Sequence, residues 1–219
     1  MIIRSENYLE IYNGCETLRI EAWANGIRVR CVPAGEIPEH TWALDQDIPC
    51  GKTTVGDDFV ECGDIRCEIY EGRLKFLRLS DKKCLLKEPS YPWALHRRSR
   101  EMHPLCGNSF SAEVYFKSYE DEKLFGMGQY RDASFNQKHR VLELAPRNSQ
   151  ISVPFLLSSR DYGFFMERPV GGNGLICGQY DQMAHRIDCL HRLLGDLRRF
   201  SEGYSEKLCR SYRQAVTSS

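Results

Sequence analysis

Apolar and polar residues alternate at every second position in several short segments of this chain, which is the period of a β-strand that buries one face. In the segment IRVRCV (27–32), the apolar residues alternate with Arg28 and Arg30. A second short run, LRIEAW (18–23), precedes it, and Asn25-Gly26 lies between the two. This dipeptide readily adopts the positive φ angles of a tight turn, so the pattern predicts a β-hairpin.

Further short runs separated by turn residues follow along the chain. The segment 65–88 divides into three runs, with turns expected at 71–72 and 80–82. The segment 110–119 alternates again, and the segment 146–169 divides into two apolar runs around 158–161. Many short strands with frequent turns indicate a mainly β fold, an antiparallel β-sandwich, which we place at residues 1–177.

Two segments depart from this pattern. Residues 88–108 are rich in Pro, His and Arg, but Glu101 interrupts the basic residues, so we expect a long surface loop rather than a basic binding patch. Residues 178–219 are basic, and their leucines hold no long helical period. We expect these residues to form a C-terminal tail that is poorly ordered or helical.

The balance of charge limits the partners of the chain. Thirty Lys and Arg residues face thirty Asp and Glu residues, which gives no general attraction to nucleic acid or to an anionic membrane. No apolar run approaches the roughly 20 residues of a membrane-spanning helix. The first residues become charged too early for a signal peptide. We therefore expect no nucleic-acid partner and no membrane partner.

The ten cysteines are scattered, with no CxxC pair, and the closest two are Cys62 and Cys67. Zinc sites usually show closely spaced ligand pairs, and none of the six histidines stands in such a spacing either. We therefore predict no metal and interpret the cysteines as reduced thiols with a packing role, which indicates a cytoplasmic location. Disulfides and a zinc site are the less favoured alternatives.

Other chemical motifs are weak. The segment GMG (126–128) has two glycines at the spacing of a phosphate loop, but it lacks the third glycine, so we expect a tight turn that leaves a strand. No GxSxG motif and no nucleophilic cysteine signature occur. Glycoside hydrolysis needs two carboxylates across a sugar, a geometry that spacing along strands cannot place. The residues alone predict no catalytic set and no cofactor.

Three segments together resemble the N-terminal domain of glycoside hydrolase family 31, the α-glucosidases and α-xylosidases. They are GRLKFLRLSDKKCLLKE (72–88), EKLFGMGQY (122–130) and LELAPRNSQISVPFLLSSRDYGFFMERPVG (142–171). The part RNSQISVPFLLSS (147–159) is most similar to the α-xylosidase branch. Residues 167–169 depart from the family, which usually has asparagines before the proline. The resemblance implies a galactose-mutarotase-like β-sandwich, a supersandwich, beside a catalytic (β/α)₈ barrel.

The resemblance also implies retaining hydrolysis of α-xylosides or α-glucosides by two aspartates of that barrel. A barrel needs about 250 residues, so we expect it to be absent from this chain and the chain alone to be inactive. A loop of the family's sandwich edges the sugar pocket, and by position the substrate-binding residues here are Arg147, Asn148, Gln150 and Phe155. We expect carbohydrate to bind when the barrel is joined, and the bare barrel-facing surface to favour self-association.

The tail suggests why the resemblance stops near Cys189. Residues 190–215 can be back-translated with suitable synonymous codons and read one base later. The shifted frame then gives one residue that the codons leave undetermined, followed by TGYWETYEDFLKAIAKSYADLTGKL. That peptide is an amphipathic helix that ends in the segment with which the family enters its barrel. We therefore expect a frameshift near Cys189, a hypothesis that the nucleotide sequence tests.

Three other functions stay open. A free-standing carbohydrate-binding module would need an exposed aromatic platform, for which Trp23, Trp42 and Trp93 are the candidates. A sugar mutarotase would need a histidine and a glutamate that face one open sheet, a pattern that no predicted strand shows. A scaffold or interaction domain is compatible with the same fold.

Overall fold

The computed structural model describes residues 1–38, 48, 50–91, 98–104, 110–131, 134–142, 144, 148, 150–166, 174–179, 182–189 and 193–198. Every regular element among them is a β-strand, and neighbouring strands within each sheet run antiparallel. The prediction of a mainly β, antiparallel sandwich is therefore confirmed. None of the described segments forms a helix long and apolar enough to cross a bilayer.

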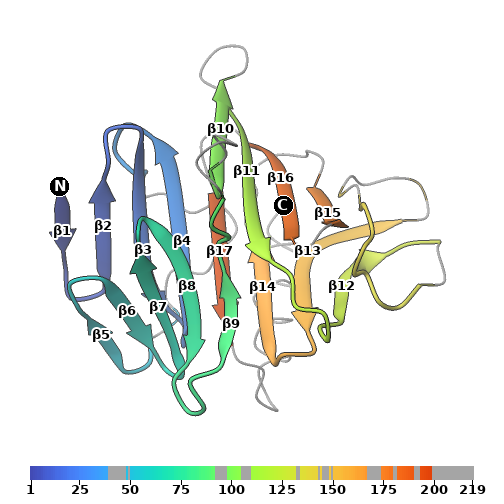
Figure 1. Cartoon of the computed structure of the whole chain (residues 1–219), viewed down its shortest axis with the longest axis horizontal. Helices are drawn as coiled ribbons and strands as arrows, with labels where there is room; N and C mark the ends of the chain where they lie inside the picture. Colours follow the sequence, from blue (N-terminus) through green and yellow to red (C-terminus); the bar gives the residue numbers. More distant parts are fainter. Residues whose placement is uncertain are drawn as a thin grey trace.

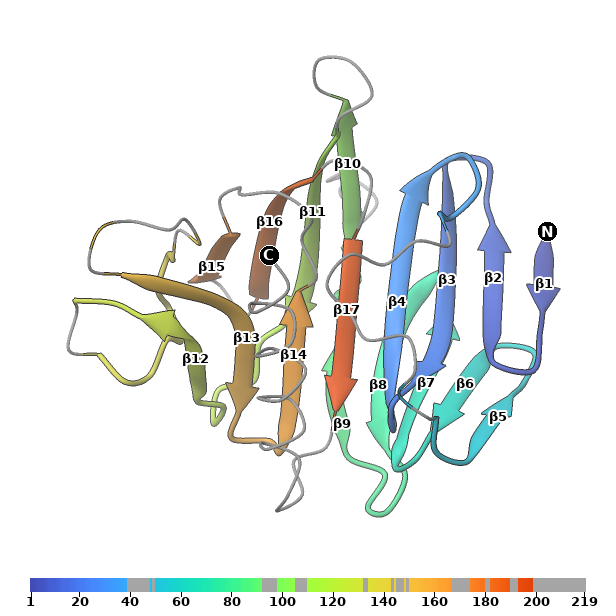
Figure 2. The ribbon, with the colours of Figure 1, turned by 180° about the vertical axis from the view of Figure 1, so that it is seen from behind.

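One layer of the sandwich is an eight-stranded sheet, which lies in front in Figure 2. Its strand order is β1 (Ile2–Arg4), β2 (Tyr8–Tyr12), β3 (Glu16–Trp23), β4 (Gly26–Pro33), β17 (Leu193–Arg198), β14 (Tyr162–Met166), β13 (Ile151–Ser158) and β12 (Leu124–Gln129).

The other layer consists of two smaller sheets that lie side by side across the first (Figure 1). The five-stranded sheet has the order β5 (Thr53–Val55), β6 (Phe59–Cys62), β7 (Ile65–Tyr70), β8 (Arg73–Arg78) and β9 (Cys84–Lys87). The four-stranded sheet has the order β10 (Arg100–Pro104), β11 (Phe110–Lys117), β16 (Gln182–Cys189) and β15 (Gly174–Gln179).

Apolar residues of the two layers meet in one core. Burial of this apolar surface is the main favourable term in folding. Strands β11 and β14 meet through the rings of Phe116 and Phe164, whose centroids lie 5.7 Å apart at 71°. The most deeply buried members of the core come from both layers: Leu9, Ile20, Ile27, Val60, Ile65, Leu86, Met127 and Leu156.

The hairpin predicted at Asn25-Gly26 forms, but its turn lies one residue earlier. Trp23 pairs with Gly26, and the two residues between them, Ala24 and Asn25, have φ angles of +48° and +65°. These are the two positive φ values of a two-residue hairpin turn. Gly26 therefore lies in the strand, and Asn25 takes the second turn position.

The polar face of this hairpin is buried as well, which alternation alone does not predict. Arg28 and Arg30 are 5% and 4% exposed, and both bind the carboxylate of Glu21 on β3 at 3.1 and 2.6 Å. Opposite charges on neighbouring strands satisfy one another across the sheet. The arginines of β4 therefore belong to a buried ionic layer on the outer face of the eight-stranded sheet.

The surface loop predicted for residues 88–108 is wrong in part, because strand β10 lies within it and pairs with β11. The sequence REMHP of β10 lacks apolar alternation because β10 is an edge strand, and its exposed half needs no apolar residues. Glu88 and Ser99, inside the same segment, are also buried.

The residues predicted to form a tail contribute backbone to both layers. Between 178 and 219, the described residues are 178–179, 182–189 and 193–198, and all of them lie in strands. The remaining tail residues lie outside the described part of the chain, so the boundary at 177 and the order of the tail stay predictions.

Candidate functional site

Two of the predicted pocket-edge residues, Asn148 and Gln150, lie at the start of β13, next to β12. Asn148 is exposed, Gln150 is half-buried immediately before β13, and Arg147 lies outside the described residues. Phe155 lies within β13, opposite Phe165 of β14, at about 16 Å along the strand from Gln150 at the usual rise. The structure thus brings Asn148 and Gln150 to one end of β13 and sets Phe155 apart from them.

The two glycines of GMG fix how closely β12 approaches this strand. A Cβ atom on Gly128 would lie 2.0 Å from the carbonyl oxygen of Ile151, and one on Gly126 would lie 2.6 Å from that of Phe155. Both glycines have positive φ angles, and the register of β12 with β13 shifts between them. The predicted tight turn is therefore wrong: the glycines form a bulge inside β12, which glycine alone accommodates.

The far end of the β13–β14 hairpin is anchored by a buried carboxylate. Glu122 is 3% exposed and accepts hydrogen bonds from the hydroxyls of Ser158 and Tyr162, the latter at 2.7 Å. Burial, followed by the nearby Glu122 carboxylate, raises the pKa of Tyr162 well above its usual value. The phenol therefore stays protonated and keeps donating to Glu122.

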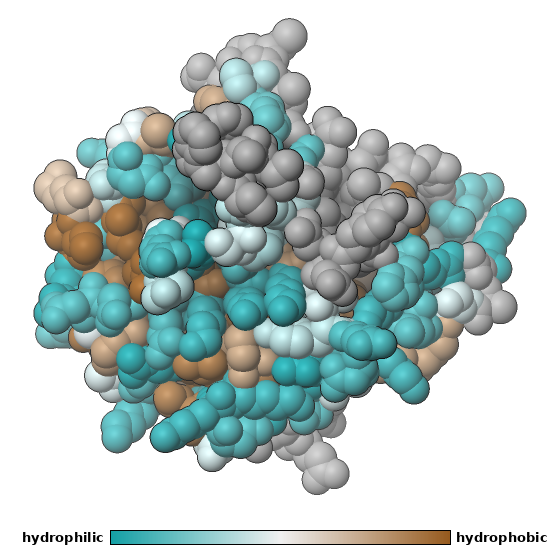
Figure 3. All heavy atoms as spheres, viewed as in Figure 1, coloured by the Kyte–Doolittle hydropathy of each residue, from teal (hydrophilic) through white to brown (hydrophobic). Residues whose placement is uncertain are grey.

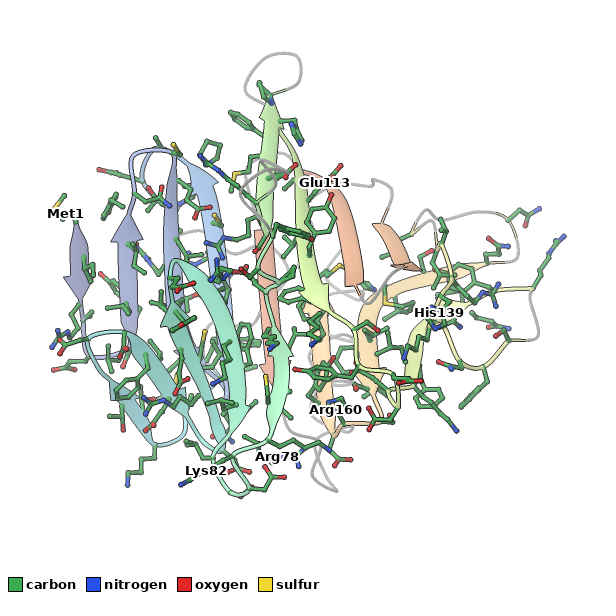
Figure 4. The ribbon with its side chains drawn as sticks, viewed as in Figure 1. Met1, Arg78, Lys82, Glu113, His139 and Arg160 are labelled. Carbon is green, nitrogen blue, oxygen red and sulfur yellow. The ribbon has the colours of Figure 1, made fainter. Side chains whose placement is uncertain are left out.

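Two arginines tie the same turn to the other layer, at the lower end of the molecule in Figure 4. Arg78 donates to the carbonyl oxygen of Arg160 at 2.5 Å, and Arg160 donates to that of Cys84 at 2.8 Å. The guanidinium of Arg160 also lies 3.9 Å from the centre of the Tyr119 ring. These contacts hold β13 and β14 in a fixed position against β8 and β9.

A buried ionic triad joins all three sheets. Arg100, at the start of β10, donates to both carboxylate oxygens of Glu88 after β9 and, at 2.8 Å, to Glu16 at the start of β3. The exposed fractions of the three side chains are 7%, 1% and 16%.

The two acids of the triad respond differently to their surroundings. Burial raises the pKa of Glu88 despite the attraction of Arg100. At the more open Glu16, burial acts in the same direction, but the hydrogen bond and charge of Arg100 outweigh it and lower the pKa. Burial acts to lower the pKa of Arg100, but the charges and hydrogen bonds of the two carboxylates together outweigh it and raise the pKa. The guanidinium is therefore a permanent cation that holds two carboxylates.

A cavity of about 360 Å³ opens beside this triad. Its lining is mostly polar, and Tyr91 is its aromatic wall, with an edge-on contact to the Tyr115 ring at 6.3 Å. A second cavity, of about 600 Å³, lies along β7, β8 and β9 and is lined by Lys75, Lys87 and Lys117 among others. Both have room for a sugar, but the carboxylates of the triad are committed to Arg100.

The cysteines with described side chains carry no disulfide. Cys15, Cys31, Cys50, Cys62, Cys67 and Cys84 are all free thiols. Burial raises the pKa of Cys31 and of Cys67 well above the usual value, which keeps both protonated and unreactive. Burial of Cys31, Cys62 and Cys67 fits the predicted packing role, whereas Cys15 and Cys50 are exposed and do not fit it. The reduced state stays a prediction. The cytoplasmic location stays a prediction.

Curated proteins that resemble the sequence include a glucosidase and a xylosidase, although no family model matches it. An uncharacterized family 31 glucosidase from Pseudescherichia vulneris is 30% identical over 207 residues, which are 85% of this chain and 39% of that protein. Alpha-xylosidase A from Aspergillus niger is 31% identical over 102 residues, which are 46% of this chain and 14% of that enzyme.

Among solved structures, a family 31 α-xylosidase from a soil metagenome, complexed with xylose, has the same fold. It superposes with a TM-score of 0.78 at 27% identity, over 92% of this chain and 32% of the xylosidase. The resemblance to glycoside hydrolase family 31 is therefore confirmed, and the chain is homologous to a part of these enzymes. It spans about two fifths of the first relative and a third of the xylosidase.

Proposed function

We propose that this chain is the N-terminal β-sandwich of a retaining α-glycosidase, which hydrolyses α-xylosides or α-glucosides when a catalytic (β/α)₈ barrel is joined to it. The alignment of 85% of the chain with a family 31 glucosidase supports this most strongly. The likeness to a xylose-bound α-xylosidase favours α-xylosides as the first substrates to test.

The carboxylates of the triad support a structural role for the sandwich. A retaining glycosidase needs two carboxyl groups about 5–5.5 Å apart that both reach the sugar. Glu16 and Glu88 lie close together but share Arg100, and the side chain of Glu88 is 1% exposed. Such a pair stabilises the junction of the sheets and leaves the chemistry to the barrel.

The sandwich would contribute the edge of the sugar pocket through the end of β13. Asn148 is exposed and Gln150 is half-buried, so both amides can donate to and accept from sugar hydroxyls. The glycine bulge of β12 and the Glu122 anchor hold this strand in place. Arg147 would belong to the same edge, and Phe155 would support it from within the sheet.

The test uses the enzyme expressed from Met1 through the alternative reading frame and its downstream barrel. It should hydrolyse p-nitrophenyl α-xyloside or α-glucoside. The Asn148→Ala and Gln150→Ala variants should raise KM more than they lower kcat, because they remove binding groups distant from the reacting atoms. The matched control is Asn7→Ala, an exposed asparagine at the other end of the eight-stranded sheet. An unchanged KM in both pocket variants would contradict the pocket-edge assignment. An enzyme that is inactive on all α-glycosides would contradict the proposed function.

A further inference from the structure

The β10–β11 hairpin gathers three metal-ligating side chains that sequence spacing does not reveal. Glu101 lies directly opposite Glu113 in the strand register, and His103 follows Glu101 by two residues, on the same face. One ligand atom from each of the three lies within 4.8 Å of the others. Figure 4 labels Glu113 on β11. The cluster was missed because residues 88–108 were interpreted as a loop.

The cluster places two like charges face to face. Carboxylates directly opposite one another on neighbouring strands destabilise the pair unless a cation lies between them. The imidazole of His103 stands beside them, with Nε2 at 3.5 Å from Oε2 of Glu101. A cation bound between the two carboxylates would balance their charges.

Neighbouring groups orient both carboxylates from behind. The backbone N–H of Arg98 donates to Oε1 of Glu101 at 3.0 Å, and Oε2 of the same carboxylate faces His103. The hydroxyl of Tyr115, a residue only 6% exposed, donates to Oε2 of Glu113. Hydrogen bonds that fix the direction of ligand atoms in advance are a regular feature of metal sites.

The donor set selects the class of ion. One imidazole nitrogen and two carboxylate oxygens suit Zn²⁺ and similar divalent ions, whereas Mg²⁺ and Ca²⁺ favour sites made of oxygen alone. Ligand atoms at the usual zinc distances lie about 3.3 Å apart in a tetrahedral site. The 3.5 Å between Nε2 of His103 and Oε2 of Glu101 is close to this distance. Glu113, whose Oε2 accepts the Tyr115 hydroxyl, would bring its other carboxylate oxygen to the ion by a small side-chain shift. The half-exposed His103 leaves a route from solvent.

We propose that Glu101, His103 and Glu113 form a three-ligand site for a divalent ion of the zinc class, with a fourth position open to water. The site would cross-link the edge strand β10 to β11 and remove the repulsion between the two acids. It lies outside both cavities described above, so it is separate from any sugar pocket they provide. This inference departs from the sequence-based prediction of no metal, which stays a prediction until the tests below.

The first test titrates Zn²⁺ into the chelator-stripped 219-residue chain by calorimetry. The exposed thiols of Cys15 and Cys50 compete for zinc, so every protein carries serine at both positions. The parent should bind one ion at this site, and His103→Gln and Glu113→Gln should each weaken that binding about tenfold or more. His139→Asn is the matched control: His139 is exposed, lies beside β12 in Figure 4, and its φ of +65° suits asparagine. Equal zinc affinity in the parent and both ligand variants overturns the proposal.

Thermal unfolding separates a metal ligand from a purely structural residue. In chelator, Glu113→Gln should melt no lower than the parent, because the amide oxygen still accepts the Tyr115 hydroxyl while the repulsion is gone. With zinc added, the parent and His139→Asn should melt higher than before, and Glu113→Gln should not. A parent whose melting temperature does not rise with zinc, together with a Glu113→Gln variant that melts lower than the parent in chelator, would contradict the metal site.

Discussion

Replacement of Arg100 by methionine tests the buried triad. The side chain of Arg100 is 7% exposed, and it neutralises Glu88, which is 1% exposed, together with Glu16. Methionine fills a similar volume but leaves the Glu88 carboxylate buried without a counterion. Breaking a buried ion pair in this way costs about 3–5 kcal/mol of the free energy of unfolding. We therefore expect Arg100→Met to lose a large share of the stability of the domain.

The cost should depend on pH in a defined direction. Burial already raises the pKa of Glu88, and loss of Arg100 raises it further. Between the unfolded pKa of a glutamate, about 4.3, and this higher native value, the native state binds more protons than the unfolded state. Stability of the variant therefore rises as the pH falls through the native pKa of Glu88. In the parent, the lowered pKa of Glu16 acts in the opposite sense, because its contribution is lost on acidification.

Urea unfolding followed by circular dichroism measures both effects. The matched control is Arg4→Met, since the ion pair of Arg4 with Asp57 is exposed, at 52% and 86%. Exposed pairs contribute at most about 1 kcal/mol. The Arg100→Met/Glu88→Leu double variant should recover part of the loss, because both charges are then gone. A loss for Arg100→Met no larger than that for Arg4→Met, or one that does not shrink in acid, refutes the reasoning.

Other predictions concern the β12–β14 region. Gly128→Ala should strongly destabilise the fold, because its Cβ would lie 2.0 Å from a backbone carbonyl oxygen. In Gly72→Ala the Cβ would meet no atom within 4 Å, so this control should lose only the backbone strain of about 1–3 kcal/mol. Urea unfolding compares the two variants. Tyr162→Phe removes a donor to the buried Glu122 and should cost about 1–3 kcal/mol at neutral pH. The pKa of Tyr162 is raised in the folded state, so the parent loses stability as the pH rises above about 10, the pKa of an unfolded tyrosine. This alkaline loss of stability should be smaller in Tyr162→Phe. Melting temperatures of both proteins at several pH values measure it.

The strands of this fold follow from local patterns where a turn is marked and one face is apolar. The turn at Glu71-Gly72 has the expected positive φ values, +49° and +74°, and separates β7 from β8 as predicted. The β13–β14 hairpin also forms around the expected turn, in which Asp161 has a φ of +62°. Gly72 and Asp161 are of residue types that tolerate this backbone, which is why the sequence marks both turns.

Features that depend on distant partners were not predictable from the sequence. Strand β10 is held by pairing with β11 and by the burial of Arg100 against Glu16 and Glu88, which are 84 and 12 residues away. No local pattern marks such a strand, so the cluster of Glu101, His103 and Glu113 also went unnoticed. The role of Gly126 and Gly128 likewise depends on how closely β13 approaches them.

The most direct test of the central claim compares the 219-residue chain with a longer protein, rebuilt in the proposed alternative frame after Cys189 and joined to a downstream barrel. Both would be assayed side by side with p-nitrophenyl α-xyloside and α-glucoside. The account predicts turnover by the longer protein and none by the chain alone, since the triad carboxylates Glu16 and Glu88 are held by Arg100. Turnover by the chain alone, after removal of host glycosidase, would mean that these strands carry a catalytic pair and would contradict the account.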